Sequence, residues 1–469
     1  MKQKFMRLNV DKRVVSIIVL LALFVLIFIS SIVARTYLFG NNSLPGTEAH
    51  FNINNAKDIS EFRKNFVIEE RAVSELIWPL LIALFSFIFR IPLDVSTILL
   101  SLLFGIFSVI LIYFIIDLIG FKKKNLAIAF FLISPVTIWL FSTFSKFIPA
   151  FFFSLLTLYL LLLGKTVASL FTLAVTSLFG IVSGLSVLTF SALSFKKDFW
   201  KWFWKAFLIV FVINLTLYFL FPFTGTFNFS LSNFFSLFFS LSQFGISIFA
   251  FLLAFIGIFA TWKDRKQRKE LFLIYIVFAL FFIFSMINKE FLFFFSLILI
   301  FLGVIGVVKL LERNWASSII RNLTLGILII GLLFPLISTP LRIASSQPEN
   351  SLIDSLDFLK GREDGVVLSA NENGYWIKSF SGKEAFVDEF KVKVKPELNE
   401  KALKFFRERN LEKLSEGFGN EGIRYVFLDS KTKQLFRTED EGILLLLKHT
   451  DNFRKIYDEE GIEIWEFIK

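Results

Sequence analysis

The hydrophobic pattern of this chain consists of long apolar runs separated by short polar intervals. Runs of roughly 17 to 25 apolar residues, long enough to cross about 30 Å of hydrocarbon as a helix, fill residues 14 to 341. Residues 342 to 469 are rich in charge and contain no such run. The pattern therefore predicts a transmembrane domain over residues 1–341 and a small soluble α/β domain over residues 342–469.

The predicted spans follow from the apolar runs and from the basic clusters between them. Five basic residues precede the first run, Val14 to Ala34, so we expect a cytoplasmic amino terminus and a retained membrane anchor. The run at 167–194 is divided near Gly180 and Gly184 into two short helices. The other spans are expected near 97–118, 126–143, 147–164, 203–221, 244–262, 270–287, 291–309 and 320–341. About eleven spans result, and an odd number makes the C-terminal domain extracytoplasmic.

The interval at 35–72 is predicted to be the first outer loop. Apolar residues recur there every three or four positions, at Ile53, Ala56, Ile59, Phe62 and Phe66. This spacing predicts an amphipathic helix on the outer membrane surface. Residues 72 to 89 form a further apolar stretch, which we interpret as a surface or re-entrant helix because a single crossing would place the next basic cluster outside.

The soluble tail alternates helix and strand patterns. Helices are expected over 351–360, 399–416 and 440–448, and strands over 365–370 and 424–430. The segments 453–457 and 462–468 are expected to close the domain as a hairpin across Glu459, Glu460 and Gly461.

Composition narrows the class of protein further. Hydrophobic residues make up 55% of the chain and the mean hydropathy is +0.70, which indicates an integral membrane protein. The tail has 21 basic and 25 acidic residues, which leaves 29 of the 50 basic and 14 of the 39 acidic residues, a charge of +15, in the membrane part. The net charge of +11 therefore reflects membrane topology and not nucleic-acid binding. The chain has no cysteine and only two histidines, His50 and His449, which excludes disulfides and thiolate or histidine-rich metal sites.

The first candidate for chemistry is Glu48, in the first outer loop, with His50 two positions further on. A carboxylate there can deprotonate an acceptor hydroxyl as a general base, or hold a divalent cation such as Mg²⁺ or Mn²⁺ against a phosphate leaving group. The alternative interpretation is an ordinary solvated glutamate.

Three further charged residues flank predicted spans. Glu75 begins an apolar stretch, where a carboxylate either lines a water-filled cavity or lies at the membrane interface. Lys146 and Lys289 fall on short outer connections, where an ammonium group can stabilise the negative charge of a departing phosphate. The alternative is that each lysine merely lies among lipid headgroups.

Three stretches together resemble the GT-C class of membrane glycosyltransferases, which includes the protein O-mannosyltransferases and the catalytic subunit of oligosaccharyltransferase. Glu48 to Ile53 is similar to the first-loop acidic motif of that class. The spans at 100–118 and 127–146 resemble the pair that precedes the second outer loop, and Val367 to Ile377 resembles the stretch around the Trp-Trp-Asp-Tyr-Gly signature. The chain departs from the class at Ala370 and Asn371, which stand where that signature has its two tryptophans, and at Lys146, where the class usually has an acidic residue.

The resemblance implies an enzyme that moves a sugar from a polyprenyl-phosphate carrier to a lipid, glycan or protein acceptor on the outer face of the membrane. Glu48 would be the catalytic base or a metal ligand. The residues implied to contact substrate are His50, Glu75, Lys146, Lys289, Glu372, Tyr375 and Trp376. Two alternatives stay open: a non-catalytic relative that binds a lipid-linked glycan or a partner enzyme, and a lipid or glycan transporter.

Overall fold

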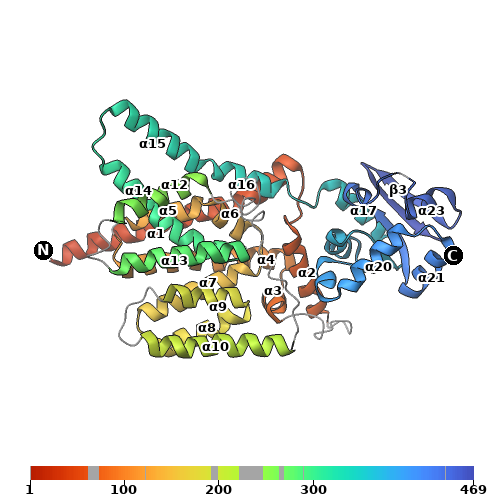
Figure 1. Ribbon diagram of the computed structural model, residues 1–469, viewed down its shortest axis with the longest axis horizontal. Coiled ribbons are helices and arrows are strands. Elements are labelled where there is room, and N and C mark those ends of the chain that lie inside the picture. The colour runs from red at the N-terminus through yellow and green to blue at the C-terminus, as the bar shows by residue number, and fades with distance from the viewer. Residues whose placement is uncertain are drawn as a thin grey trace. The chain divides into compact units, whose positions relative to one another are not determined.

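The computed structural model describes residues 2–61, 73–121, 123–191, 199–220, 247–262, 269–288, 290–438 and 440–468. They form two compact units (Figure 1). The helical unit comprises the described residues up to 39, from 73 to 220 and from 247 to 345. The C-terminal unit comprises residues 40–61 and the described residues from 346 onward, so it takes in part of the predicted first outer loop.

Within its described ranges, the helical unit contains helices and no strands. They are α1 (Lys2–Phe39), α3 (Val73–Phe89), α4 (Leu93–Ile119), α5 (Lys124–Ile133), α6 (Pro135–Ser142), α7 (Phe147–Leu162), α8 (Thr166–Leu178), α9 (Ile181–Ser191), α10 (Phe199–Leu220), α12 (Ile248–Trp262), α13 (Lys269–Ile287), α14 (Phe291–Glu312), α15 (Ser318–Leu333) and α16 (Pro335–Ala344). Helices α8, α9 and α10 pack side by side around a core that includes Leu173, Val187 and Trp202 (Figure 1).

Five stretches of helix in the described residues are long and apolar enough to cross a membrane, which supports a multi-pass membrane protein. They are Arg13–Phe39, Leu93–Ile119, Trp200–Leu217, Phe291–Glu312 and Ser318–Ala344. A sixth results if the bent pair α5 and α6 counts as one span, and six further apolar helices are shorter. The number of eleven spans therefore stays a prediction.

The sequence predicted one of two helix breaks in the helical unit but not the other. The run at 167–194 does divide into two helices, α8 and α9, with Gly180 in a conformation of positive φ between them. The run at 126–143, expected as one span, bends by 63° between α5 and α6. Ser134 is extended there because it precedes Pro135, and a proline disfavours the helical conformation of the residue before it.

Helices α12 and α14 approach each other closely through glycines. A Cβ atom on Gly257 would lie 2.0 Å from the carbonyl oxygen of Leu302, and one on Gly306 would lie 2.1 Å from the carbonyl oxygen of Leu253. Both obstacles are backbone atoms, so a side chain at either position separates the helices. Small residues allow this kind of close backbone contact between membrane helices.

We expect Gly306→Ala to lower the thermal stability of the detergent-solubilised protein, because overpacking costs about 1–3 kcal/mol. Gly326→Ala, in α15, is the matched control, because no described atom lies within 4 Å of its added Cβ. Equal melting temperatures for the two variants would contradict the close α12–α14 contact.

The C-terminal unit combines helices with one four-stranded sheet. Its elements are α2 (Thr47–Ser60), α17 (Asn350–Lys360), β1 (Val366–Leu368), the 3₁₀ turn η3 (Asn371–Asn373), α18 (Gly374–Trp376), the π-helical turn η4 (Ile377–Ser381), α19 (Glu389–Val394), α20 (Pro396–Arg407), α21 (Leu411–Glu421), β2 (Ile423–Leu428), α22 (Ser430–Lys433), α23 (Ile443–His449), β3 (Phe453–Glu459) and β4 (Ile462–Phe467). The strand order is β1-β2-β4-β3, with β1 parallel to β2 and the other pairs antiparallel.

Both faces of the sheet are covered. Val426 and Leu428 of β2 belong to a core with residues of α20, α21 and α23. Tyr425 and Phe427 of the same strand point to the other face and belong to a core with residues of α17, α18 and η4. This alternation along a strand is the period-two pattern of side chains in a sheet, and it makes the unit a three-layer α/β/α structure.

The sequence predicted all four strands of this unit and several of its helices. Helix α17, strands β1 and β2 and the β3–β4 hairpin are present where they were expected, with Glu460 and Gly461 at positive φ in the turn. The single helix expected over 399–416 is wrong, since α20 and α21 are separate. Asn410 begins α21 by accepting hydrogen bonds from the amides of Glu412 and Lys413, which is the role of a helix N-cap.

Glu466 of β4 makes the stability of this unit sensitive to acid. It accepts hydrogen bonds from Arg424 and from Arg454, the latter at 2.6 Å, and its side chain is 8% exposed. Burial alone would raise the pKa of Glu466, but the hydrogen bonds from the two arginines outweigh it and lower the pKa.

A lowered carboxyl pKa contributes stability that is present above the ordinary glutamate pKa and is lost as the pH falls through the folded-state value. We therefore expect Glu466→Gln to lower the unfolding free energy by about 1–3 kcal/mol at pH 7 and by less in acid. Glu384→Gln is the control, because that carboxylate is 67% exposed in its ion pair with Lys391. Chemical denaturation at pH 7 and pH 4 measures both, and a pH-independent loss at Glu466 would contradict the assignment.

Candidate functional site

Glu48 lies in the first turn of α2, within the C-terminal unit. The helix begins at Thr47, after Gly46 in a conformation of positive φ, and Glu48 is half-buried. The amino end of a helix carries a partial positive charge that favours the ionised form of a nearby carboxylate. The chain thus holds its first-loop acid on a short, ordered helix.

His50 anchors α2 to the rest of the C-terminal unit. Its Nδ1 atom lies 3.1 Å from the hydroxyl oxygen of Ser379, and its Nε2 atom lies 3.0 Å from the carbonyl oxygen of Leu44. The imidazole ring, in a residue only 6% exposed, packs edge-on against Trp376 with centroids 4.9 Å apart. Both ring nitrogens therefore have partners inside the unit, and the role of His50 as a substrate contact stays a prediction.

The buried face of α2 is mainly polar, which differs from the expected apolar membrane-facing surface. Asn54 donates a hydrogen bond to the carbonyl oxygen of Tyr375 at 3.1 Å and accepts one from Ser379 at 3.0 Å. Asp58, whose side chain is 7% exposed, receives a hydrogen bond from Lys378 at 2.5 Å. These contacts fix α2 to α18 and η4, more than 300 residues away in sequence.

We expect Lys378→Met to loosen α2, because it leaves the Asp58 carboxylate buried without its cation at a cost of about 1–3 kcal/mol. Amide hydrogen exchange over residues 47–60 should accelerate. Lys431→Met is the matched control, because the Lys431–Glu372 ion pair is about half exposed and such pairs are worth less than about 1 kcal/mol. Unchanged exchange in Lys378→Met would show that the ion pair does not hold the helix.

The three candidate residues of the tail have different environments. Glu372 is exposed and pairs with Lys431 at 3.1 Å. Tyr375 is half-buried, and its ring lies 5.2 Å from that of Phe51 of α2. Trp376 is 1% exposed and belongs to the core beside the sheet, and its role as a substrate contact stays a prediction. Gly374 permits this packing, because a Cβ there would lie 2.6 Å from the carbonyl oxygen of Val387.

In the helical unit, Glu75 and Lys146 form an ion pair. Their side chains are only 19% and 16% exposed, so the pair lies where isolated charges would be costly. One turn further along α3, the indole nitrogen of Trp78 donates to the carbonyl oxygen of Phe144 at 3.1 Å. Phe144 itself is fully buried with a φ of 53°, a conformation that non-glycine residues seldom adopt. Helix α3 is therefore bonded at two points to the connection that precedes α7.

The sequence analysis missed several residues that hold α2 in place, and it named one candidate, Lys289, that the structure does not describe. Asn54, Asp58, Lys378 and Ser379 were not candidates. The three asparagines of α2, at positions 52, 54 and 55, were the available signal for a polar contact surface. Buried polar side chains need hydrogen-bond partners. Lys289 lies outside the described residues.

The described residues do not fit a metal centre built from side chains. Nowhere in the described ranges do three histidine, cysteine, aspartate or glutamate residues gather as a group that could hold an ion. Divalent cations bound by protein carboxylates usually take several oxygen ligands. That Glu48 holds a divalent cation therefore stays a prediction from the sequence.

Comparison with known proteins gives structural neighbours only. No protein-family model matches the chain, and no curated protein sequence does. A crystal structure of the Archaeoglobus fulgidus oligosaccharyltransferase, tethered to an acceptor peptide with an NVT sequon, matches 96% of this chain and 74% of its own at 12% identity and a TM-score of 0.61. ArnT from Cupriavidus metallidurans bound to undecaprenyl phosphate matches 96% of this chain and 97% of its own at 11% identity and a TM-score of 0.59. The mycobacterial arabinofuranosyltransferase AftD matches 97% of this chain and 40% of its own at 12% identity and a TM-score of 0.59.

Proposed function

We propose that this chain, which has the fold of the GT-C glycosyltransferases, moves a sugar from a polyprenyl-phosphate carrier to an acceptor on the outer face of the membrane. The observation that carries the proposal is the similarity of fold, over nearly the whole length of both chains, to a protein bound to undecaprenyl phosphate. The apolar helices, several of them long enough to span a bilayer, suit a substrate that is part lipid.

In the proposed reaction, Glu48 acts as general base. The acceptor heteroatom attacks the anomeric carbon of the sugar, and the bond between that carbon and the phosphate oxygen breaks. The proton of the acceptor passes to Glu48, and the bonding electron pair leaves with the polyprenyl phosphate. A base placed in this way contributes about 10²–10⁴-fold to the rate. Its place on α2 supports this role, because α2 is bonded to the rest of its unit.

The departing phosphate needs a cation, and we assign this role to Lys146. Glu75 supports the assignment, because its ion pair fixes the position of the ammonium group within the helical unit. A lysine has three N–H donors, so it can bind a phosphate oxygen while it remains paired with Glu75. Lys289 is proposed as a second cation on the basis of the sequence alone.

The C-terminal unit is proposed to meet the acceptor. Glu372 is an exposed carboxylate and Tyr375 a half-buried phenol, and both belong to the same unit as Glu48. Tyr375 also contacts α2 through its carbonyl oxygen and its ring. An acceptor held by this surface would therefore be held by the unit that carries the base.

The experiment that tests the proposal uses the purified full-length protein and a panel of radiolabelled polyprenyl-phosphate sugars, with and without manganese. Label is expected to leave one of these carriers in the presence of acceptor. A chain that binds a labelled carrier but transfers nothing, for any donor in the panel, would instead support the non-catalytic alternative. Two observations favour that alternative. The charge of Lys146 is already neutralised by its ion pair with Glu75, and Ala370 and Asn371 stand where the GT-C signature has tryptophans.

A further inference from the structure

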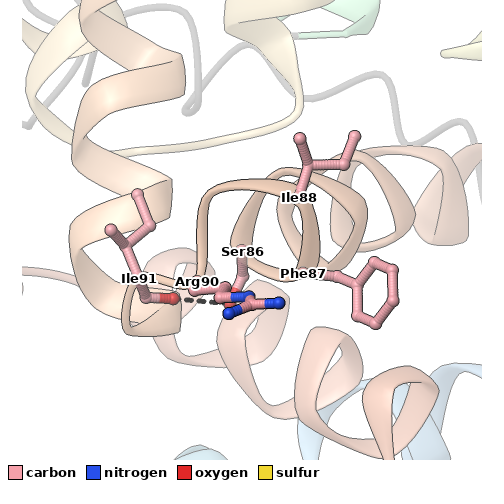
Figure 2. Close-up of a pocket in the computed structure, with 5 residues that line it drawn as sticks. All are labelled: Ser86, Phe87, Ile88, Arg90 and Ile91. Carbon is pink, nitrogen blue, oxygen red and sulfur yellow. Dashed lines mark hydrogen bonds between the residues drawn. The ribbon is translucent and has the colours of Figure 1, made fainter.

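The turn between α3 and α4 contains a pocket with a single cation. Its lining residues are Ser86, Phe87, Ile88, Arg90 and Ile91, and its volume is about 500 Å³. Figure 2 shows the Arg90 side chain lying between Ile91 and Phe87, beside the hydrogen bond that the Ser86 hydroxyl donates to the carbonyl oxygen of Ile91 at 2.6 Å. The amide of Ile91 also donates to the carbonyl oxygen of Ser86, so the turn is closed by two hydrogen bonds.

Arg90 occupies a backbone position that ordinarily favours glycine. Its φ is 54°, in the left-handed region, and the end of α4 uses Gly120 with a φ of 78° for the same purpose. A non-glycine residue in this conformation costs about 1 kcal/mol or more. The chain thus places a long cationic side chain in a strained turn where a glycine would close the helix with less strain.

The guanidinium group of Arg90 has no protein counter-charge in the described part of the chain. Neither a hydrogen bond nor an ion pair joins it to a described residue, although Asp94 lies four positions further on. Two of the lining side chains, Phe87 and Ile88, are apolar and exposed, with 82% and 60% of their surface accessible. A cation flanked by exposed apolar side chains matches a ligand that has an anionic head and a hydrocarbon tail.

The pocket lies at the end of a candidate membrane span. It lies just before Leu93, the first residue of α4, and the 27 residues of α4 form one of the candidate spans. The end of a span that crosses the bilayer lies at the level of the lipid headgroups, where arginine and aromatic residues concentrate.

We propose that Arg90 and its pocket bind the phosphodiester headgroup of an anionic glycerophospholipid, with Phe87 and Ile88 against the acyl chains. One guanidinium charge matches the single negative charge of a phosphodiester. Free polyprenyl phosphate is a monoester with a charge near −1.5 to −2 at neutral pH, and matches it less well. A polyprenyl-phosphate sugar is a singly charged diester, and a competition experiment separates it from a glycerophospholipid. This lipid site is independent of the proposed transfer reaction.

Native mass spectrometry of the full-length protein in detergent tests the proposal, with phosphatidylglycerol and phosphatidylcholine as probes. Wild type should retain phosphatidylglycerol in preference to phosphatidylcholine. Arg90→Gln and Arg90→Gly should reduce the retained phosphatidylglycerol about fivefold, as expected for one arginine at a membrane surface. Arg90→Gly should also melt no lower than wild type, because glycine relieves the left-handed strain, so its loss of lipid cannot be ascribed to unfolding.

Arg321→Gln is the matched control, because Arg321 is an exposed arginine near the start of another candidate span and bonds only to Asn322 in the described structure. It should retain phosphatidylglycerol like wild type. Retention in Arg90→Gln equal to wild type, or an equal loss in Arg321→Gln, would overturn the site. Displacement of phosphatidylglycerol by equimolar undecaprenyl phosphate, or by an equimolar polyprenyl-phosphate sugar, would assign the pocket to the polyprenyl carrier. Displacement by millimolar inorganic phosphate would show that the acyl chains contribute nothing, and either result contradicts the proposal.

Discussion

Replacing Glu48 with glutamine is expected to reduce sugar transfer by about 10²–10⁴-fold, because the amide cannot accept the proton of the acceptor. The side chain keeps its size, and the loss of one negative charge at the amino end of a helix costs only about 0.3–1 kcal/mol. The melting temperature should therefore change little. Initial rates over a range of donor concentrations should place the loss in kcat, since the proton transfer belongs to the chemical step and not to donor binding.

The matched control for this substitution is Glu61→Gln, which removes an exposed carboxylate at the other end of the same helix. Its transfer rate should remain within about twofold of wild type, because exposed charges contribute little to a reaction at a distance. A Glu48→Gln protein that melts like wild type and turns over at the wild-type rate would remove Glu48 from the mechanism.

The Glu75–Lys146 pair gives the second large effect, in both stability and activity. Lys146→Met leaves the Glu75 carboxylate unpaired where its side chain is only 19% exposed, and breaking a buried ion pair in this way costs about 3–5 kcal/mol. Poor expression or a strongly lowered melting temperature is the expected result. Glu75→Gln should have a smaller effect, because the glutamine amide oxygen can still accept a hydrogen bond from the ammonium group of Lys146.

The double variant Glu75→Gln/Lys146→Met separates the structural role of the pair from the proposed catalytic one. It removes both charges of the pair together, so the melting temperature should recover most of the loss seen in Lys146→Met. Transfer should nevertheless stay about 10²–10³-fold below wild type, because the cation for the departing phosphate is missing. Recovery of both stability and transfer in the double variant would show that the pair is structural only.

Local patterns were sufficient for much of the C-terminal unit. The β3–β4 hairpin could be predicted because alternating residues flank a turn at Glu460 and Gly461, and α17 because its apolar residues recur at helical spacing. The separation of α20 from α21 was harder to foresee. It depends on Asn410 acting as a cap within a charged segment that contains no glycine or proline.

The site was less predictable because its contacts join distant segments. Asn54 and Asp58 of α2 bond to residues 375–379, and nothing in the local pattern of residues 47–60 identifies those partners. The periodicity of Ile53, Ala56 and Ile59 indicated a helix correctly, but the side that is buried is largely polar. Phe62 and Phe66, which belonged to the same pattern, lie outside the described residues. Likewise, Glu75 and Lys146 were separate candidates, and only the fold brings them together as an ion pair.

The central claim is that this protein breaks the bond between a sugar and a polyprenyl phosphate. The most direct measurement is the amount of free polyprenyl phosphate formed when the purified wild-type protein, in lipid nanodiscs, is given a polyprenyl-phosphate sugar and an acceptor. The amount of free polyprenyl phosphate should increase with time and with enzyme concentration, and it should nearly disappear in Glu48→Gln. Equal release from wild type and Glu48→Gln, or no release from any donor that the protein demonstrably binds, would contradict it.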